Sequence, residues 1–215
     1  MNRLNFTFLL SLFIGTLFGQ DSHNLEFPEG VYFTKQDFLD KRATVIPKMR
    51  KVNICPGCNP LADSIVNHCY FLNEKNDIIK KAFAFSHKGE LYFQYYGVKT
   101  NLAENTFLAL KDDDRFCYRV LDKGRYLYIE MSGDVAGSLM EAVMTPAGVH
   151  TSNFNSKSIL VYDNNQNKFM GFDGCPAVKK FLKNNYPEKV WDCPASRPKF
   201  FEEVRNLFTE FNTSE

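Results

Sequence analysis

The central part of the chain alternates between short runs of aromatic and β-branched residues and brief turn sequences. Runs at residues 68–72, 79–86 and 91–96 are separated by the turns NEKND and HKGE. Aromatic and β-branched residues are enriched in strands. Turns of this length join antiparallel neighbours, because a parallel crossover needs a dozen or more residues. The pattern therefore predicts a meander of β-hairpins.

The same alternation continues towards the C-terminus. Within residues 106–131 the turns DDD and DKG separate three further β-type runs. In the last run, Tyr126, Tyr128 and Glu130 alternate with aliphatic residues, which indicates a strand with one buried face. SILVYD and FMGF, on either side of NNQNK, predict one more hairpin.

Helical patterns flank the strand-rich region. Thr34 and Asp37 have the spacing of a capping box after a short strand at residues 31–33. Residues 134–149 carry apolar side chains at helical spacing, and three helices are expected in AVKKFLKNN, YPEKVW and RPKFFEEVRNLFTEF. The expected fold class is α+β, with a mainly antiparallel β-sheet and short helices clustered at the C-terminus.

The N-terminus has the pattern of a secretory signal peptide. Arg3 supplies a positive charge, an apolar segment runs from Phe6 to Phe18, and Gly19 follows it. The apolar segment is short for a membrane span, although an uncleaved anchor is the alternative. We expect a signal peptide at residues 1–19 and a single α+β domain at residues 20–215, exported to the periplasm or secreted.

The charge balance argues against one class of partner. The chain has 26 Lys and Arg residues against 25 Asp and Glu residues, and no basic run. Proteins that bind nucleic acid neutralise phosphates with clustered cations. We therefore expect no nucleic-acid partner and no stable membrane span after signal cleavage. A protein, peptide or carbohydrate ligand is expected instead.

Six cysteines follow the signal segment, namely Cys55, Cys58, Cys69, Cys117, Cys175 and Cys193. An even number in an exported chain favours structural disulfides, because the compartments outside the cytoplasm are oxidising. We expect Cys175 to pair with Cys193, and Cys55 or Cys58 to pair with Cys69. Cys117 would then take the remaining partner or stay a buried thiol.

Cys55 and Cys58 form the sequence CPGC, which has two further interpretations. Thiol–disulfide oxidoreductases carry such a pair at a helix N-terminus, where the helix dipole stabilises the thiolate. Here the expected helix starts only after the motif, and a β-meander follows instead of βαβ units. Alternatively, the pair could bind zinc together with His68 and Cys69, although the second paired motif of a typical zinc site is missing.

No complete catalytic set is visible in the sequence. The four histidines lie in separate segments, and there is no Gly-x-Ser-x-Gly turn. We therefore expect a non-enzymatic binding or accessory domain that uses no cofactor. Its candidate binding surface is formed by Tyr92, Tyr95, Tyr96, Tyr126 and Tyr128, because tyrosine offers apolar contact with a polar tip. Cross-strand packing is the alternative role for these rings.

Several segments resemble uncharacterised small exported proteins of Bacteroidetes. A Gly-x-Tyr-x-Thr-x-x-Asp-Phe pattern is matched by Gly30, Tyr32, Thr34, Asp37 and Phe38. AFAFSHKGELYFQ, GRYLYIE, ILVYDNNQNKFMGF and YPEKVW follow in the order typical of that group. The resemblance implies export, and it supplies no activity, cofactor or catalytic residue. The cysteines are not part of the pattern.

Overall fold

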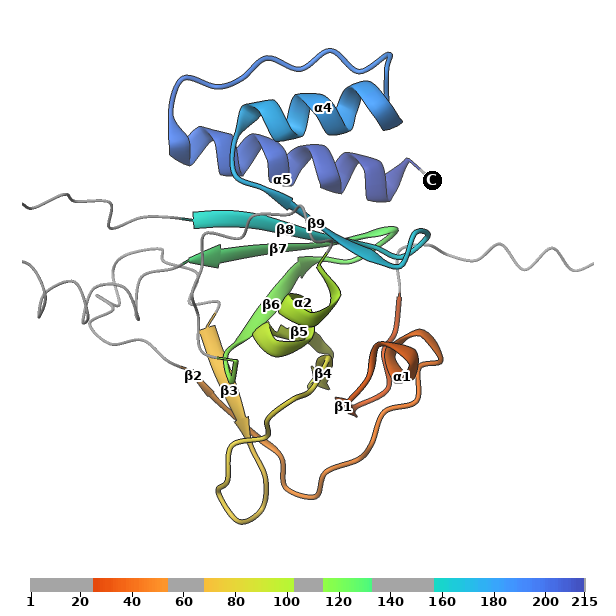
Figure 1. The fold of residues 1–215 in the computed structure, drawn as a ribbon, viewed down its shortest axis with the longest axis vertical. Coiled ribbons are helices and arrows are strands. Elements are labelled where there is room, and N and C mark those ends of the chain that lie inside the picture. The colour runs from red at the N-terminus through yellow and green to blue at the C-terminus, as the bar shows by residue number, and fades with distance from the viewer. Residues whose placement is uncertain (1–24, 54–67, 103–113, 133–156, 215) are drawn as a thin grey trace, which may run out of the picture.

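The structure, a computed structural model, describes residues 25–53, 68–102, 114–132 and 157–214 (Figure 1). Within these ranges the chain forms nine strands in one sheet and four helices. The strands are β1 (Gly30–Tyr32), β2 (Arg50–Asn53), β3 (His68–Leu72), β4 (Ala84–His87), β5 (Glu90–Gln94), β6 (Cys117–Asp122), β7 (Tyr126–Ser132), β8 (Lys157–Asp163) and β9 (Lys168–Phe172). The helices are α1 (Lys35–Leu39), α2 (Tyr95–Asn101), α4 (Cys175–Asn185) and α5 (Arg197–Thr213).

Strands β4 to β9 lie beside one another in chain order, with β1 next to β4. All pairings between the named strands are antiparallel, so the predicted meander and the α+β class are confirmed. The β2–β3 hairpin branches from this path, because β3 pairs with β6. A β-bulge between Val120 and Asp122 interrupts the pairing of β6 with β7, and bulges increase the local twist of a strand.

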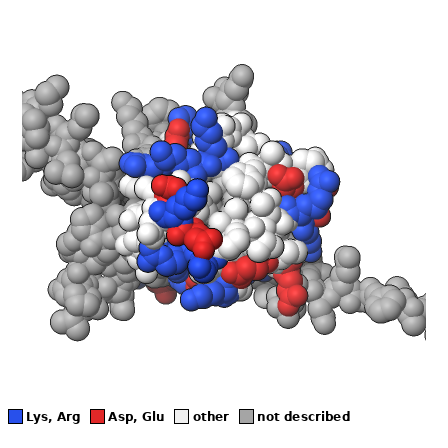
Figure 2. Space-filling view, turned by 90° about the horizontal axis from the view of Figure 1, so that it is seen from below, with Lys and Arg blue, Asp and Glu red and all other residues white. Residues whose placement is uncertain are grey.

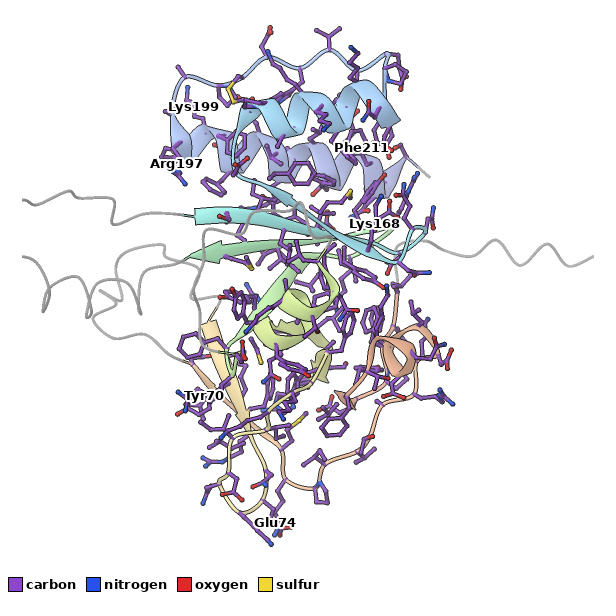
Figure 3. The ribbon with its side chains drawn as sticks, viewed as in Figure 1. Tyr70, Glu74, Lys168, Arg197, Lys199 and Phe211 are labelled. Atoms are coloured by element: carbon purple, nitrogen blue, oxygen red, sulfur yellow. A yellow bond between two sulfur atoms is a disulfide. The ribbon has the colours of Figure 1, made fainter. Side chains whose placement is uncertain are left out.

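Helices α4 and α5 cover one face of β7, β8 and β9 (Figure 1). The buried apolar residues of α5 recur at spacings of three and four along the helix and are Phe200, Phe201, Val204, Leu207, Phe208 and Phe211. Phe211, labelled in Figure 3, stacks on Tyr186 with ring centroids 3.9 Å apart. Burial of each such side chain contributes roughly 1.5–3 kcal/mol to folding.

The opposite face of the sheet packs against α1 and α2. Thr34 caps α1 as predicted, since its hydroxyl accepts from the Asp37 N–H at 3.0 Å and the Asp37 carboxylate accepts from the Thr34 N–H at 3.0 Å. Phe38 on this helix packs against Phe93 and Tyr162, with ring centroids 5.3 and 5.6 Å away. The five-residue helix α1 therefore places one aromatic ring, that of Phe38, in the core.

A third hydrophobic cluster lies on the half of the sheet formed by β1 and β3 to β6. It is on the face opposite α1 and α2, which we call the outer face. It contains Val31, Cys69, Phe71, Ile79, Ala82, Phe85, Tyr92 and Cys117. Ile46 and Met49 pack against it from the segment that precedes β2. Both faces of the sheet are therefore covered over much of their area.

Three local predictions are wrong. The strand expected from Ile79 begins only at Ala84. A strand was expected to continue to Tyr96, but β5 ends at Gln94 and α2 follows. The buried side-chain amide of Gln94 donates to the Ile79 carbonyl at 2.9 Å and accepts from the Ala82 N–H at 2.7 Å, while Gln94 itself stays paired with Cys117 in the sheet. Gly97 permits the close approach of α2, because an added Cβ would lie 2.6 Å from Phe83 Cα.

The helix expected at residues 186–191 is also absent from the structure, which has a turn there. This segment must connect two helices that pack side by side, and Tyr186 and Trp191 both pack into the cluster beneath α4 and α5. The predicted helices at residues 134–149 and after Pro60, and the strand near residue 108, lie outside the described residues.

Candidate functional site

The tyrosines predicted to form a binding surface are mostly core residues. Tyr92, Tyr95, Tyr126 and Tyr128 are at most 7% exposed, and only Tyr96 is half-buried. Tyr126 and Tyr128 pack against Phe208 of α5, with ring centroids 5.3 and 5.8 Å away. The predicted exposed surface is therefore wrong, because α4 and α5 cover the strand face that carries two of these rings.

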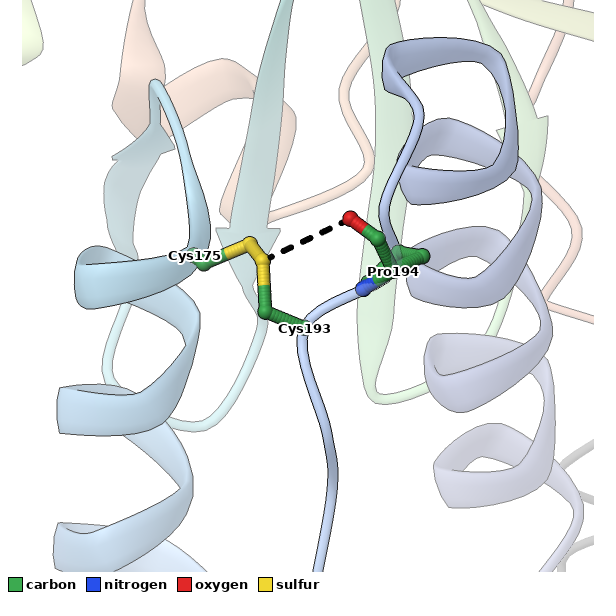
Figure 4. The surroundings of a disulfide bond; sticks show 3 residues. All are labelled: Cys175, Cys193 and Pro194. Atoms are coloured by element: carbon green, nitrogen blue, oxygen red, sulfur yellow. Dashed lines mark hydrogen bonds between the residues drawn. A yellow bond between two sulfur atoms is a disulfide. The ribbon is translucent and has the colours of Figure 1, made fainter.

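Cys175 and Cys193 form a disulfide, as predicted (Figure 4). Their Cα atoms are 5.7 Å apart, within the normal range for disulfides. The bond joins the start of α4 to the segment that precedes α5. It therefore limits how far the two C-terminal helices can separate.

Cys69 and Cys117 are buried free thiols. The structure has no bond from Cys69 to Cys55 or Cys58, and Cys117 is a buried thiol, which was one of its two expected states. Cys69 instead lies opposite Cys117 on neighbouring strands. The CPGC motif itself is outside the described residues.

The predicted zinc ligands are only partly described. His68 and Cys69 are consecutive residues of β3, and their backbone partners are Tyr118 and Cys117. Among the residues that the structure places, no group of three or more His, Cys, Asp or Glu side chains is arranged to hold a metal ion. Of the four described helices, none combines the length and the hydropathy that a membrane span requires.

Four polar side chains on the outer face of the sheet form a hydrogen-bonded group, which we call the charge network. It consists of Lys51 on β2, Glu90 and Tyr92 on β5, and Arg119 on β6. Lys51 Nζ donates to the Tyr92 hydroxyl at 2.7 Å and lies 3.3 Å from Glu90 Oε2. The Tyr92 hydroxyl donates to Glu90, and Arg119 Nη1 donates to Glu90 Oε1 at 2.9 Å.

Strand register assembles the charge network. Glu90 and Tyr92 are two residues apart on β5, so their side chains point to the same face. Arg119 is the register partner of Tyr92. Lys51 reaches the group from β2, and its Nζ also lies 5.1 Å from the centroid of the Tyr92 ring. Three strands thus bring together charges that are far apart in the sequence.

The charge network is partly open to solvent. The side chains of Lys51, Glu90 and Arg119 are 28%, 39% and 38% exposed. The Tyr92 ring is buried in the third hydrophobic cluster, where it contacts Phe71 edge-on with centroids 5.2 Å apart. The charged ends therefore lie at the rim of a packed cluster, which restricts their movement.

The carboxyl of Glu90 is held in its ionised form. Burial raises its pKa, but hydrogen bonds from Tyr92, Arg119 and Lys51, with the charge of Lys51, outweigh that effect and lower the pKa to about 2. Burial and the Glu90 carboxylate raise the pKa of Tyr92 above its usual value. Neither group changes charge near neutral pH, so this pair is poorly suited to general acid–base chemistry.

The charge network has a surplus of positive charge and of hydrogen-bond donors. Two cations, Lys51 and Arg119, face one anion, Glu90, which leaves a net charge of +1. A guanidinium has five N–H donors, and among the described residues Arg119 donates only to Glu90. Figure 2 shows positive and negative side chains side by side over one end of the molecule, without a continuous field of one sign.

An open depression of about 490 Å³ lies near the same end of the sheet. It is lined by Leu25, Glu26, Phe27, Pro28, Lys41, Ser86, Gly89 and Lys123. Lys123 Nζ donates to the Gly89 carbonyl at 2.5 Å. Gly89 stands in the turn between β4 and β5, directly before Glu90 of the charge network. The depression also carries two cations and one anion.

Sequence patterns did not identify Lys51, Glu90 or Arg119. Each stands among ordinary strand residues, and their association depends on register between strands that are distant in the chain. A partial signal was available in Lys51 and Arg119, which are charged residues inside an extended segment and an expected strand, whereas Glu90 was expected in the turn HKGE. No protein-family model, curated protein or solved structure matches the chain.

Proposed function

We propose that this protein is an exported, non-enzymatic binding domain that recognises a carboxylate-bearing ligand through the charge network. The observation that carries the proposal is the Arg119 guanidinium. It is fixed by one hydrogen bond to Glu90 at 2.9 Å and is 38% exposed. Its other N–H groups have no acceptor among the described residues, so they are available to a ligand. Planar guanidinium groups bind carboxylates through paired hydrogen bonds.

The arrangement reduces the cost of binding. Glu90 and the packed Tyr92 ring hold Arg119 and Lys51 in place before a ligand arrives, so less side-chain freedom is lost. Lys51 adds a second positive charge beside Arg119. The net charge of +1 favours an anionic group over a neutral one, and the carboxylate of Glu90 discourages a cationic ligand approaching the same donors.

Export is supported by two features. The N-terminal sequence has the order of a signal peptide, and Cys175 is bonded to Cys193. Disulfides of this structural kind persist in oxidising compartments. A periplasmic or extracellular binding protein would meet acidic peptides and saccharides that contain uronic acids, which both present carboxylates.

The proposal is tested with a matched panel of probes. An oligo-glutamate peptide and an oligogalacturonate present carboxylates on different backbones, while an oligo-glutamine peptide and a neutral galacto-oligosaccharide are their uncharged counterparts. Isothermal titration at low salt should show binding of one carboxylate probe and at least tenfold weaker binding of its neutral counterpart. Binding of neither carboxylate probe, or equal binding of charged and neutral probes, would overturn the proposal.

A further inference from the structure

Cys69 and Cys117 lie directly opposite each other on antiparallel strands. Opposed residues in such a ladder have Cα atoms about 4.5–5.5 Å apart, which is inside the range that a disulfide spans. The Cys69 thiol donates to the Cys117 carbonyl oxygen at 3.7 Å. The backbone therefore already has the separation that a bond between the two sulfur atoms requires.

The two thiols are buried, which protects them from reagents in solution. Cys69 is 2% exposed and Cys117 is fully buried, both within the third hydrophobic cluster. Burial, followed by contact with Cys69, raises the pKa of Cys117, which keeps its thiol protonated in the folded state. Thiolates are the reactive species in disulfide exchange, so oxidation requires an opening of the hairpin or takes place during folding.

The position of the pair gives a bond there a structural consequence. Strand β3 joins the sheet through two residue pairs with β6, His68 with Tyr118 and Cys69 with Cys117. Strand β2 pairs only with β3 among the described strands. The β2–β3 hairpin is therefore attached to the sheet by a short ladder of which the cysteines are half.

We propose that Cys69 and Cys117 form a cross-strand disulfide that fastens the β2–β3 hairpin to β6, with a glutathione-like or protein disulfide as the oxidant. One cysteine thiolate attacks a sulfur of the oxidant. A mixed disulfide forms between the protein and the oxidant, and the other half of the oxidant leaves as a thiol. The second cysteine thiolate attacks the protein sulfur of that mixed disulfide and releases the other thiol. Two protein thiols lose two electrons and two protons, and the oxidant is reduced to two thiols.

The proposed pairing also limits the possible bonding partners of the two cysteines in the CPGC motif. With Cys175 bonded to Cys193 and Cys69 bonded to Cys117, the remaining two of the six cysteines are Cys55 and Cys58. A partner from elsewhere in the chain is then unavailable to either of them.

Disulfide mapping of the wild-type protein tests the pairing. The protein is incubated with oxidised glutathione, free thiols are alkylated in acid, and the chain is cut by trypsin and Asp-N. Trypsin alone leaves Cys55, Cys58 and Cys69 in one peptide, residues 52–75, whereas Asp-N cuts before Asp63 and releases Cys69 in residues 63–75. The expected product is residues 63–75 joined to residues 116–119. Alkylation of Cys69 and Cys117, or a bond from Cys69 to residues 52–62, would overturn the proposal.

Hydrogen exchange tests the fastening of the hairpin. A variant with Cys55, Cys58, Cys175 and Cys193 changed to Ser retains only the proposed pair. In its oxidised form, amides of β2 and β3 should exchange at least tenfold more slowly than in its reduced form, while the β8–β9 hairpin should be unchanged as an internal control. Equal exchange of β2 and β3 in the two forms would refute the fastening role. If this variant does not fold, the wild-type map still decides the pairing.

Discussion

Asn212 binds the backbone of Tyr126 through both atoms of its side-chain amide. The Tyr126 N–H donates to Asn212 Oδ1 at 2.8 Å, and Asn212 Nδ2 donates to the Tyr126 carbonyl at 2.9 Å. Asn212 is 4% exposed near the end of α5, so one buried side chain attaches this helix to the first residue of β7. Gly124 leaves room for it, because an added Cβ would lie 2.5 Å from Asn212 Cγ.

Asn212→Ala should lower the free energy of unfolding by about 2–3 kcal/mol, since it leaves a buried N–H and a buried carbonyl without partners. Urea denaturation measures this change. Asn185→Ala is the matched control, because the Asn185 amide only donates to the Phe181 carbonyl within its own helix. An equal effect of both substitutions would contradict the attachment of α5 through Asn212.

Arg205 on α5 compensates the Glu130 carboxylate on β7, with Nε at 3.0 Å and Nη2 at 2.5 Å from Glu130 Oε1. The Glu130 side chain is only 7% exposed. Arg205→Leu should therefore cost about 3 kcal/mol in urea denaturation, because the buried Glu130 carboxylate loses its ion pair with Arg205. The Glu130→Leu/Arg205→Leu double variant should recover most of that loss.

The exposed pair of Lys189 and Glu210 provides the control for this prediction, since their side chains are 31% and 56% exposed. Lys189→Leu should cost less than about 1 kcal/mol, as is usual for surface ion pairs. If Arg205→Leu were as mild as Lys189→Leu, the burial of Glu130 would have no energetic importance.

Glu90 should make stability depend on pH below about 4.5. Its pKa falls from 4.5 to about 2 on folding, so the unfolded chain takes up the proton first as the pH decreases. The stabilisation is complete above pH 4.5 and is lost as the pH falls towards 2. Because Glu90 is partly exposed, we expect about 1 kcal/mol. Urea denaturation should show Glu90→Gln less stable than wild type at pH 7 and equal to it near pH 2. A constant difference across that range would contradict the assignment.

The disulfide between Cys175 and Cys193 closes a short loop, with a sequence separation of 18 residues. Replacing both cysteines with serine should lower stability by about 3 kcal/mol, mainly because the unfolded chain gains freedom. Denaturation without reductant measures the loss. The same double substitution should have no further effect on protein whose disulfides have been reduced, and a persistent difference there would indicate a packing defect instead.

Local patterns were sufficient for much of the fold. The turns HKGE and NNQNK lie at the hairpins that the sequence predicted, and the capping box of Thr34 and Asp37 begins α1. These features depend on residues that are close in the chain. The pairing of Cys175 with Cys193 was also accessible, because both flank one short pair of helices.

Tertiary packing explains the predictions that were wrong. The alternation of Tyr126 and Tyr128 indicated a strand correctly, but it could not reveal that α5 covers their face of the sheet. The helix from Tyr95 forms where Gly97 meets the Phe83 backbone, a contact between distant segments. The charge network was missed for the same reason, since it exists only through the register of β5 with β6 and the approach of β2.

The central claim, that Arg119 binds a carboxylate, is tested most directly by the affinity of Arg119→Gln for the carboxylate probe that the wild-type protein binds. Arg50→Gln is the matched control, because it removes the same charge from β2, where Arg50 is exposed and donates to Asn76 at 2.7 Å. Isothermal titration should show at least a tenfold loss of affinity for Arg119→Gln, as expected for a charged hydrogen bond, and less than a twofold loss for Arg50→Gln. Equal affinities of Arg119→Gln and the wild-type protein would contradict the account.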